Sequence, residues 1–354
     1  MAVNLAHVGT SRAATFEFAR PVVAITPLPD GGFLLADFAA GQSRVVRATA
    51  SGPLLDAPWI HEATPRIAVT VGDRQGALSP ALLPDLLAAW DAGLRSGVPG
   101  FLGQGAVQTQ AATFLAGRFG GRDLLLAATA DGQGLSSFVL DPDQSVQAGI
   151  TVITALAPAE IAGRAFLILA AADSSSLTVL RVGSGGALDV ADHVIDGLAT
   201  RFAGVSHLEV VTVEGHVFVL VAGRDAGLSL LRLTAEGRLL HLDTLADEAA
   251  FALNGVSGLA AQVRAGGIDI LVTAAGEAGL SLFRVDLGPL GLVLQGNAAR
   301  IEGGARDDLL SRGSGNGVLD GAEGDDTLSD GPGADTLIGG TGADVFVHRA
   351  DGLR

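Results

Sequence analysis

Residues 303–347 read GGARDDLLS RGSGNGVLD GAEGDDTLS DGPGADTLI GGTGADVFV, which is one nine-residue unit written five times. The units follow the pattern G-G-x-G-x-D-x-U-x, in which U is a large apolar residue. The eighth place is apolar in every unit: Leu310, Leu319, Leu328, Leu337 and Phe346. The sixth place is an aspartate in four units: Asp308, Asp326, Asp335 and Asp344. The second unit departs from the pattern, because Gly317 stands where the aspartate belongs.

The first six residues of each unit predict a tight turn, since glycine tolerates the positive φ that such turns need. A turn of this kind exposes main-chain carbonyls. Carbonyl and carboxylate oxygens are the hard ligands that Ca²⁺ prefers, in sets of six to eight at roughly 2.3–2.6 Å. The candidate calcium ligands are therefore Gly304, Gly313, Gly324, Gly333, Gly340, Gly342, Asp308, Asp326, Asp335 and Asp344.

The last three residues of each unit are expected to be extended, with the apolar residue facing inward. One unit cannot bury that side chain alone, so neighbouring units must stack. Without a metal ion the carboxylates repel one another, and a glycine-rich chain is costly to order. Folding of this segment and Ca²⁺ binding are therefore predicted to be one event.

This segment resembles the RTX (repeats-in-toxin, haemolysin-type) calcium-binding proteins, whose repeats form a parallel β-roll. The resemblance covers residues 303–347 and is expected to run on into 348–354. A disordered glycine–aspartate linker is the alternative interpretation. A linker, however, has no reason to place an apolar residue at the eighth place of every unit.

The resemblance also implies where ions would lie. In a β-roll each unit makes half a turn, so the loops alternate between two edges and an ion lies between loops two units apart. Loops ending at Asp308, Asp326 and Asp344 would share one edge with two intact sites. Loops ending at Gly317 and Asp335 would share the other edge. The missing carboxylate there predicts a weak or empty site.

Composition bounds the class of protein. The chain has 354 residues, enough for two or more domains, and its formal net charge of −16 argues against nucleic acid as a partner. It has no cysteine, which excludes disulfide and thiolate chemistry. No apolar run reaches the roughly 18 residues typical of a transmembrane segment. The N-terminus does not have the pattern of a secretory signal peptide.

Export is nevertheless implied by the resemblance. RTX-like proteins generally leave the cell through type I secretion machinery, guided by a C-terminal signal, and meet high Ca²⁺ only outside. We therefore expect a secreted, extracellular protein. Because the sequence stops at Arg354, soon after the last repeat, the roll domain at 301–354 is expected to be truncated at its C-terminus.

Residues 1–300 repeat on a longer period. The clearest unit, at 205–245, contains HLEVVTV, VFVLVAG, LSLLRLT and LLHLDTL, four short strands separated by turn residues. The next copy ends in LGLVLQG at 290–296, and weaker copies begin near residues 22, 113 and 165. A four-strand unit with a period of about 45–50 residues is typical of a β-propeller blade. The second strands are apolar at both odd and even positions, which predicts burial on both faces of the sheet.

We therefore predict an all-β chain: a β-propeller-like domain at 1–300, then a short parallel β-roll. About six four-stranded blades are expected, with five to seven possible; a solenoid and a β-sandwich are the rival architectures. A helical insertion is predicted near 79–97, where Ser79 is a candidate N-cap. Some bacterial RTX-type proteins have a similar N-terminal region. The third strands carry matched arginines, which we expect on a solvated rim: Arg47, Arg181, Arg232 and Arg284.

Sequence motifs of catalysis are missing. Neither H-E-x-x-H nor G-x-S-x-G occurs, so a zinc protease and a nucleophile elbow are both unsupported. Carboxylates near the turns between second and third strands could ring an axial channel, as in propeller lactonases, although aspartate also favours such turns for local reasons. These carboxylates are Asp37, Asp131, Asp173, Asp225 and Glu277.

The sequence thus favours a non-enzymatic, secreted, calcium-binding protein with a propeller that serves as a binding or spacer domain. No catalytic residue is assigned, and the propeller's ligand is not identified. Two alternatives stay open: an exported lactonase-like hydrolase with an axial site, and an adhesin or matrix protein. The propeller is expected to fold without calcium, because its apolar strands can bury a core unaided.

Overall fold

The computed structural model describes residues 3–12, 24–28, 31–37, 42–55, 60–61, 67–71, 74–78, 111–119, 122–129, 135–139, 145–148, 153–183, 188–277 and 279–348. Every element among them is a β-strand, so the predicted all-β class is confirmed. The predicted helix near 79–97 lies outside the described residues. In the part of the chain that the structure describes, no helix is long and apolar enough to cross a membrane.

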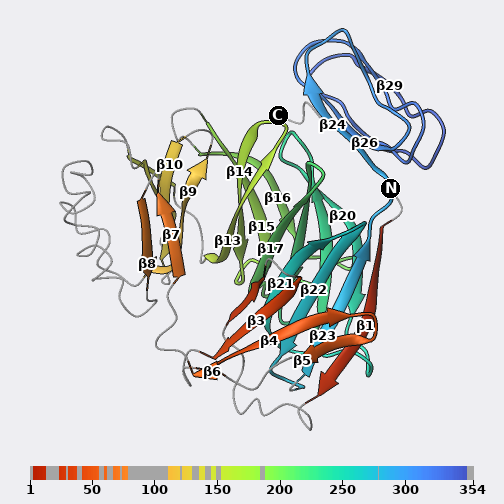
Figure 1. The fold of residues 1–354 in the computed structure, drawn as a ribbon. Helices are drawn as coiled ribbons and strands as arrows, with labels where there is room; N and C mark the ends of the chain where they lie inside the picture. Colours follow the sequence, from red (N-terminus) through yellow and green to blue (C-terminus); the bar gives the residue numbers. More distant parts are fainter. Residues whose placement is uncertain are drawn as a thin grey trace.

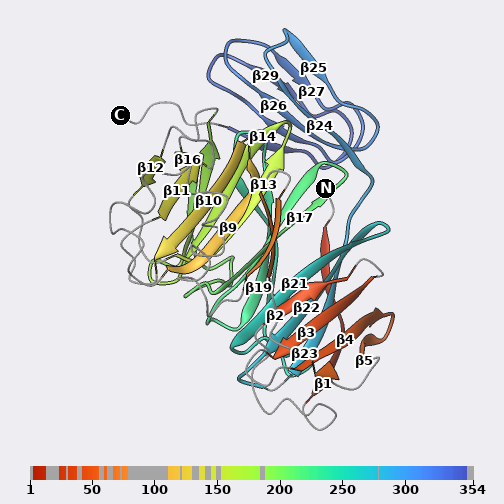
Figure 2. The same cartoon turned by 60° about the vertical axis from the view of Figure 1, so that its left-hand side comes forward.

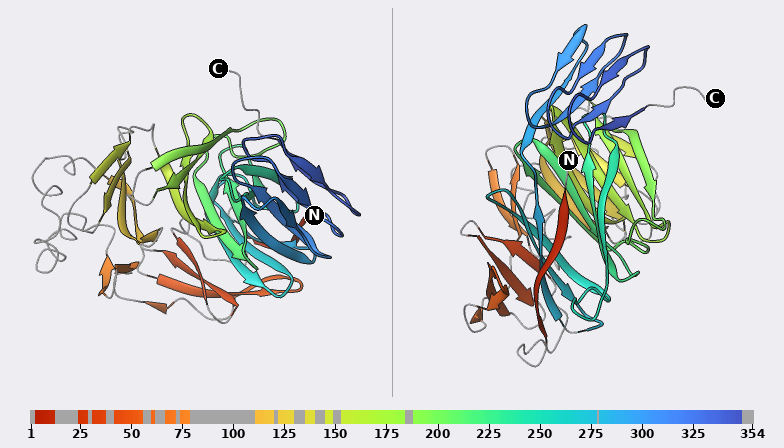
Figure 3. Two further views of the ribbon diagram at one scale, coloured as in Figure 1. Left: turned by 90° about the horizontal axis from the view of Figure 1, so that it is seen from above. Right: turned by 90° about the vertical axis from the view of Figure 1, so that its right-hand side faces the viewer.

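Antiparallel sheets follow one another around a ring, which is a β-propeller (Figures 1 and 3). The first sheet contains β2 (Ala24–Pro27), β3 (Gly32–Asp37), β4 (Gln42–Thr49) and β5 (Gly52–Leu55), with β6 (Ile60–His61) beside β4. The second is the hairpin of β7 (Ile67–Val71) and β8 (Arg74–Leu78). The third contains β9 (Ala111–Phe119), β10 (Arg122–Thr129), β11 (Leu135–Val139) and β12 (Ser145–Ala148).

Three further sheets complete the ring. The fourth contains β13 (Ile153–Ile161), β14 (Arg164–Ala171), β15 (Ser176–Val182) and β16 (Leu188–Ile195). The fifth contains β17 (His207–Val213), β18 (His216–Ala222), β19 (Gly227–Leu233) and β20 (Leu239–Ala246). The sixth contains β21 (Val256–Arg264), β22 (Gly267–Ala274), β23 (Gly279–Asp286) and β1 (Asn4–Arg12). The first strands of neighbouring sheets pack in the order β7, β9, β13, β17, β21, β2, which places the six sheets that the structure describes around the axis.

The N-terminal strand closes the sixth sheet. β1 pairs antiparallel with β23, from Asn4 opposite Asp286 to Arg12 opposite Gly279. The sequence interpretation that residues 290–296 supply this fourth strand was wrong. They form β24 (Leu290–Gly296), which pairs in parallel with β26 (Asp307–Arg312) and so opens a sheet of the roll. The first and last parts of the propeller are thereby joined by main-chain hydrogen bonds.

Apolar side chains fill the spaces between the sheets. All seven residues of β18 are buried, and so are seven of the eight residues of β22, which confirms the expected burial of second strands. Phe218 and Phe283 are completely buried in the cluster between the fifth and sixth sheets. Burial of a phenylalanine is worth roughly 1.5–3 kcal/mol, so this core contributes to the stability of the propeller.

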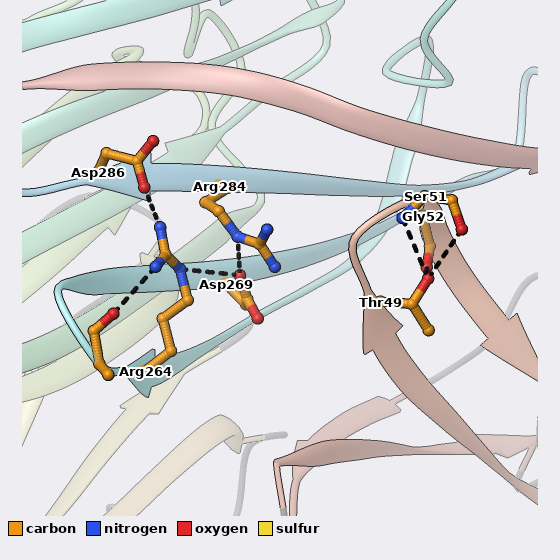
Figure 4. Close-up of polar contacts among 8 residues, drawn as sticks. Thr49, Ser51, Gly52, Arg264, Asp269, Arg284 and Asp286 are labelled. Carbon is orange, nitrogen blue, oxygen red and sulfur yellow. Dashed lines mark hydrogen bonds and ion pairs between the residues drawn. The ribbon is translucent and has the colours of Figure 1, made fainter.

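Figure 4 shows an ion-pair network across β21, β22 and β23 of the sixth sheet. The Nε atom of Arg284 donates to Asp269 at 2.7 Å, and Arg264 pairs with both Asp269 and Asp286. Arg284 is one of the matched third-strand arginines, and it lies partly exposed as predicted. Figure 4 also shows the β4–β5 turn, where Thr49 donates to the carbonyl of Gly52 at 2.7 Å.

The roll consists of two parallel sheets stacked on the propeller (Figure 2). One sheet has the order β24, β26, β28 (Thr327–Ser329), β30 (Val345–Val347), and the other has β25 (Arg300–Glu302), β27 (Val318–Asp320), β29 (Thr336–Ile338). Eighth-place residues Leu310, Leu319 and Leu328 are fully buried between them, as predicted. Phe346 differs from the prediction: it lies in the last described coil and is 53% exposed.

Apolar contacts dock the roll on the propeller. Leu309 of β26 is fully buried in the cluster between the fourth and fifth sheets, where Val293 of β24 also packs. Leu290 joins the cluster between the fifth and sixth sheets. The seventh place of the first repeat therefore serves the propeller core, while the eighth place serves the core of the roll.

Candidate metal centre

The repeats alternate between two edges of the roll. Loops 303–308, 321–326 and 339–344 lead into β26, β28 and β30, and we call their side the first edge. Loops 312–317 and 330–335 lead into β27 and β29 of the other sheet and form the second edge. The expected half-turn per repeat is therefore confirmed.

On the first edge the sixth-place aspartates form a ladder through the main chain. The Oδ1 atom of Asp326 accepts a hydrogen bond from the N–H of Asp308 at 2.8 Å, and that of Asp344 accepts one from the N–H of Asp326 at 3.0 Å. Asp308 itself accepts bonds from the N–H groups of Leu292 and Gly304. Each carboxylate thus joins two loops or strands that lie far apart in the sequence.

A second ladder runs beside it from the fifth place of the repeats. Asp307 accepts a hydrogen bond from the N–H of Asp325 at 3.0 Å, and Asp325 accepts one from the N–H of Ala343 at 2.8 Å. Sequence reasoning missed these residues, although an aspartate visibly recurs at the open fifth place in ARDD and EGDD. Their role is to hold successive loops in register and to add negative charge to the first edge.

Glycine at the first place of the first-edge repeats is a steric requirement of the aspartate at the sixth. A Cβ atom built on Gly303, Gly321 or Gly339 would overlap the Oδ2 atom of the aspartate in its own repeat. The loop therefore wraps closely around its carboxylate. In the first-edge loops a side chain at the first place would therefore clash with the aspartate at the sixth.

The first edge is a buried concentration of negative charge. Asp308 and Asp326 are completely buried, and Asp307 is 5% exposed. Burial, together with the neighbouring Asp308, Asp344 and Asp307, raises the pKa of Asp326 to about 6. Its Oδ2 atom has no hydrogen-bond partner among the described residues. A buried carboxylate oxygen of this kind calls for a cation.

The donor set fits calcium. Within the described residues no three carboxylate or imidazole groups converge as a metal cluster, so an ion here would need main-chain ligands as well. Main-chain carbonyls lie between successive loops: those of Ala322 and Gly324 lie against Gly340 and Gly342, and that of Ala322 also accepts a hydrogen bond from the N–H of Thr341. Carboxylate plus several carbonyl oxygens is the hard, flexible set typical of Ca²⁺.

A cation of the propeller reaches this edge. Arg232 of β19 is 1% exposed and donates to Thr327 at 3.4 Å, next to Asp326. Burial lowers the pKa of Arg232 to about 10, against the opposing effect of Asp307, Asp308 and Asp326. The prediction of a solvated rim holds for Arg181 but is wrong for Arg232, because the roll covers its position.

His216 extends the link between the propeller and the roll. Arg232 donates to the Nδ1 atom of His216, and the Nε2–H group of His216 donates to the carbonyl of Gly291 in β24 at 3.1 Å. Burial and the charge of Arg232 lower the pKa of His216 to about 4. A neutral imidazole therefore bridges the guanidinium and the first strand of the roll.

The structure divides the predicted ligands between the two edges. On the first edge it brings together Gly304, Gly324, Gly340, Gly342, Asp308, Asp326 and Asp344. On the second edge it places Gly313, Gly333 and Asp335. Four of these glycines have the positive φ expected of the turns: Gly324, Gly333, Gly340 and Gly342. Asp335 lies beside the guanidinium of Arg312, with Nε and Oδ1 3.4 Å apart.

The carboxylates proposed to ring the propeller axis do not converge as far as they are described. Asp173, Asp225 and Glu277 occupy the turns after β14, β18 and β22, and no metal cluster is found among the described residues. The side chains of Asp37 and Asp131 lie outside the described ones. The axial-site hypothesis gains no support from these residues.

One carboxyl on a first strand is perturbed. Burial raises the pKa of Glu209 in β17 to about 7, although it accepts a hydrogen bond from the N–H of Ala261. The folded state therefore keeps a proton that the unfolded state loses near its ordinary value of 4.5. The contribution of the Glu209 carboxyl to the free energy of unfolding is fully present below pH 4.5 and is lost as the pH rises towards 7.

Replacing Glu209 by glutamine should remove this loss. We expect the propeller to gain about 1–2 kcal/mol at pH 8 and little at pH 4, since each unit of pKa difference is worth at most 1.36 kcal/mol. Denaturant unfolding at both pH values measures the effect. Glu160→Gln, at an exposed position of β13, is the matched control. An equal response of the two variants would contradict the prediction.

Comparison with known families identifies the repeats. A family model described as RTX calcium-binding nonapeptide repeat (4 copies) matches residues 296–328 and 311–346. Residues 296–346 therefore carry RTX calcium-binding repeats, folded as a parallel roll. A search of curated proteins gives no match.

Solved structures resemble the chain only distantly. A streptogramin B lyase matches at 11% identity, with 80% of this chain and 98% of that chain covered and a TM-score of 0.37. A candidate 6-phosphogluconolactonase from Bacteroides fragilis matches at 11% identity, with 74% and 69% covered and a TM-score of 0.35. At these scores the likeness says nothing about activity.

Proposed function

We propose that this chain is a secreted, non-enzymatic calcium-binding protein, in which two Ca²⁺ ions bind on the first edge of the roll. One ion would lie between the loops ending at Asp308 and Asp326, and the other between the loops ending at Asp326 and Asp344. Gly304, Gly324, Gly340 and Gly342 belong to the same loops, and their turns would contribute carbonyl ligands.

The observation that carries this proposal is the unsatisfied, buried oxygen of Asp326 at the middle of the aspartate ladder. A carboxylate in that position is flanked by Asp308 and Asp344 and is removed from water. Without a cation it destabilises the fold, whereas with one it becomes a ligand. The RTX repeat match supports calcium as that cation.

The propeller has a different part in this proposal. Its core is apolar and needs no metal, so it would serve as a permanently folded binding or spacer domain to which the roll is attached. Calcium would be scarce inside the cell and abundant outside. The roll would then complete its folding after export, which fits the type I secretion route of RTX-like proteins.

Calcium titration of the full chain tests the proposal. We expect two bound Ca²⁺ per chain by calorimetry, and slower amide hydrogen exchange in residues 303–347 with Ca²⁺ than with EGTA. Exchange in β3 should change little, because its buried Phe33 and Leu35 lie in a cluster that contains no residue of the roll. Mg²⁺ at the same concentration is the control. Absence of calcium binding, or identical exchange in Ca²⁺ and EGTA, would refute the proposal.

A further inference from the structure

Both repeats on the second edge lack the first-place glycine: the fourth begins with Asp330, and the second departs from the pattern at two places. In the second repeat the first place is Arg312 instead of glycine, and the sixth place is Gly317 instead of aspartate. The usual arrangement is thus reversed, with the charged residue at the start of the loop and the glycine at its end. The charge also has the opposite sign.

The side chain of Arg312 is buried in the space enclosed by the second-edge loops. It is 1% exposed, as is the side chain of Asp335. Its guanidinium donates to the carbonyl of Ala298 and to that of Gly315 at 3.3 Å, and its Nε lies 3.4 Å from Asp335 Oδ1. Ala298 lies in the loop that leads into β25, Gly315 in the loop before β27 and Asp335 in the loop before β29, so the partners come from three successive loops of the same sheet.

Gly317 leaves room for the side chain of Arg312. A Cβ atom on Gly317 would overlap the guanidinium of Arg312. On the first edge the corresponding overlap is between the first-place glycine and the sixth-place carboxylate. The two departures of the second repeat from the pattern are therefore one change, because the arginine fits only where the aspartate is missing.

We propose that the guanidinium of Arg312 takes the place of a calcium ion on the second edge. It contacts two loop carbonyls and one buried carboxylate, which is the kind of oxygen set that would otherwise hold a metal. Asp335 is then an ion-pair partner and not a calcium ligand. This inference rests on the proposed function of the first edge, and it adds that the second edge needs no calcium.

Arg312 and Asp335 form an ion pair without a hydrogen bond between them. Neither oxygen of Asp335 has a hydrogen-bond partner among the described residues, and the Nε of Arg312 approaches without hydrogen-bond alignment. A single positive charge enclosed with a single negative charge needs no further ion. A divalent cation added beside Arg312 would meet its charge at close range and would be repelled.

Restoring the repeat pattern should create a calcium site. The double variant R312G/G317D turns the second repeat into the consensus and supplies a second carboxylate opposite Asp335. We expect calorimetry of the full chain to show three Ca²⁺ per chain, against two for the wild type. A folded double variant that binds the same number as the wild type would overturn the inference. A wild type that binds none would instead refute the proposed function.

Single variants give an independent readout in EGTA. Arg312→Met should lower the melting temperature of the roll by about 5 °C or more, since an unpaired carboxylate is left buried. Arg306→Met, at an exposed position of the first repeat, is the matched control and should have little effect. Asp335→Asn should leave two bound Ca²⁺ per chain. Loss of an ion in Asp335→Asn, or equal melting of the two arginine variants, would overturn the inference.

Discussion

Replacing Asp326 by asparagine should stabilise the calcium-free roll and destabilise the calcium-saturated one. The amide has the same shape, and its oxygen can still accept the hydrogen bond from the N–H of Asp308. The substitution removes the carboxyl group of Asp326, whose pKa is raised to about 6 by burial and by three neighbouring aspartates. Above that pH the folded state carries the cost of ionising Asp326. Its removal should therefore add about 1–2 kcal/mol in EGTA at pH 7.5.

With calcium the sign of the effect reverses. Asp326 lies between the other two aspartates of the ladder, so both proposed sites share it. An ion at 100 times its Kd adds about 2.7 kcal/mol to folding, and two such ions add about 5 kcal/mol. Loss of a charged ligand should weaken each site at least tenfold, since charge count tunes Ca²⁺ affinity over many orders of magnitude. At the same Ca²⁺ concentration a tenfold weaker site adds only about 1.4 kcal/mol, so about half or more of the calcium-dependent stabilisation should be lost.

Thermal melting of the roll, followed with and without Ca²⁺, checks both signs. Asp335→Asn is the comparison, because it removes a carboxylate from the second edge. It should lower stability in EGTA, since it leaves Arg312 buried without its partner, and it should leave the calcium response intact. If Asp326→Asn and Asp335→Asn behave alike, the assignment of different roles to the two edges is wrong.

The repeats of this chain could be predicted from the sequence because each carries its own local evidence. A period of nine, with glycine turns and one apolar residue per unit, indicates the roll, and alternation of loops between two edges follows from it. The blades were likewise recognisable from four apolar strands at a fixed period. In both cases the residues that decide the structure lie within one unit.

The contacts between distant segments could not be predicted. Residues 290–296 have the apolar alternation of a blade's fourth strand and of a roll's first strand, and only the pairing of β24 with β26 decides between them. The closing strand β1 pairs with β23, although most of the sequence lies between the two strands. Arg232 occupies the same place in its strand as Arg181, and the roll that buries Arg232 is encoded far away in the sequence.

The position of Arg232 predicts a second large effect. Replacing Arg232 by methionine should destabilise the roll and its docking by about 3–5 kcal/mol, the usual cost of removing one partner of a buried charge pair. Methionine fills a similar volume, so the loss is electrostatic. It removes the donor to His216 and Thr327 and the only cation that the described part of the propeller brings against Asp307, Asp308 and Asp326.

Calcium should compensate for part of this loss. Bound ions would supply positive charge to the same carboxylates, so the destabilisation by Arg232→Met should be larger in EGTA than in saturating Ca²⁺. Hydrogen exchange at residues 327–329 and denaturant unfolding in both conditions measure the difference. Arg181→Met, at the matched but exposed position of β15, should change stability by less than about 0.5 kcal/mol. A loss that is the same with and without calcium would show that Arg232 only packs against the roll and does not share its charge with the calcium edge.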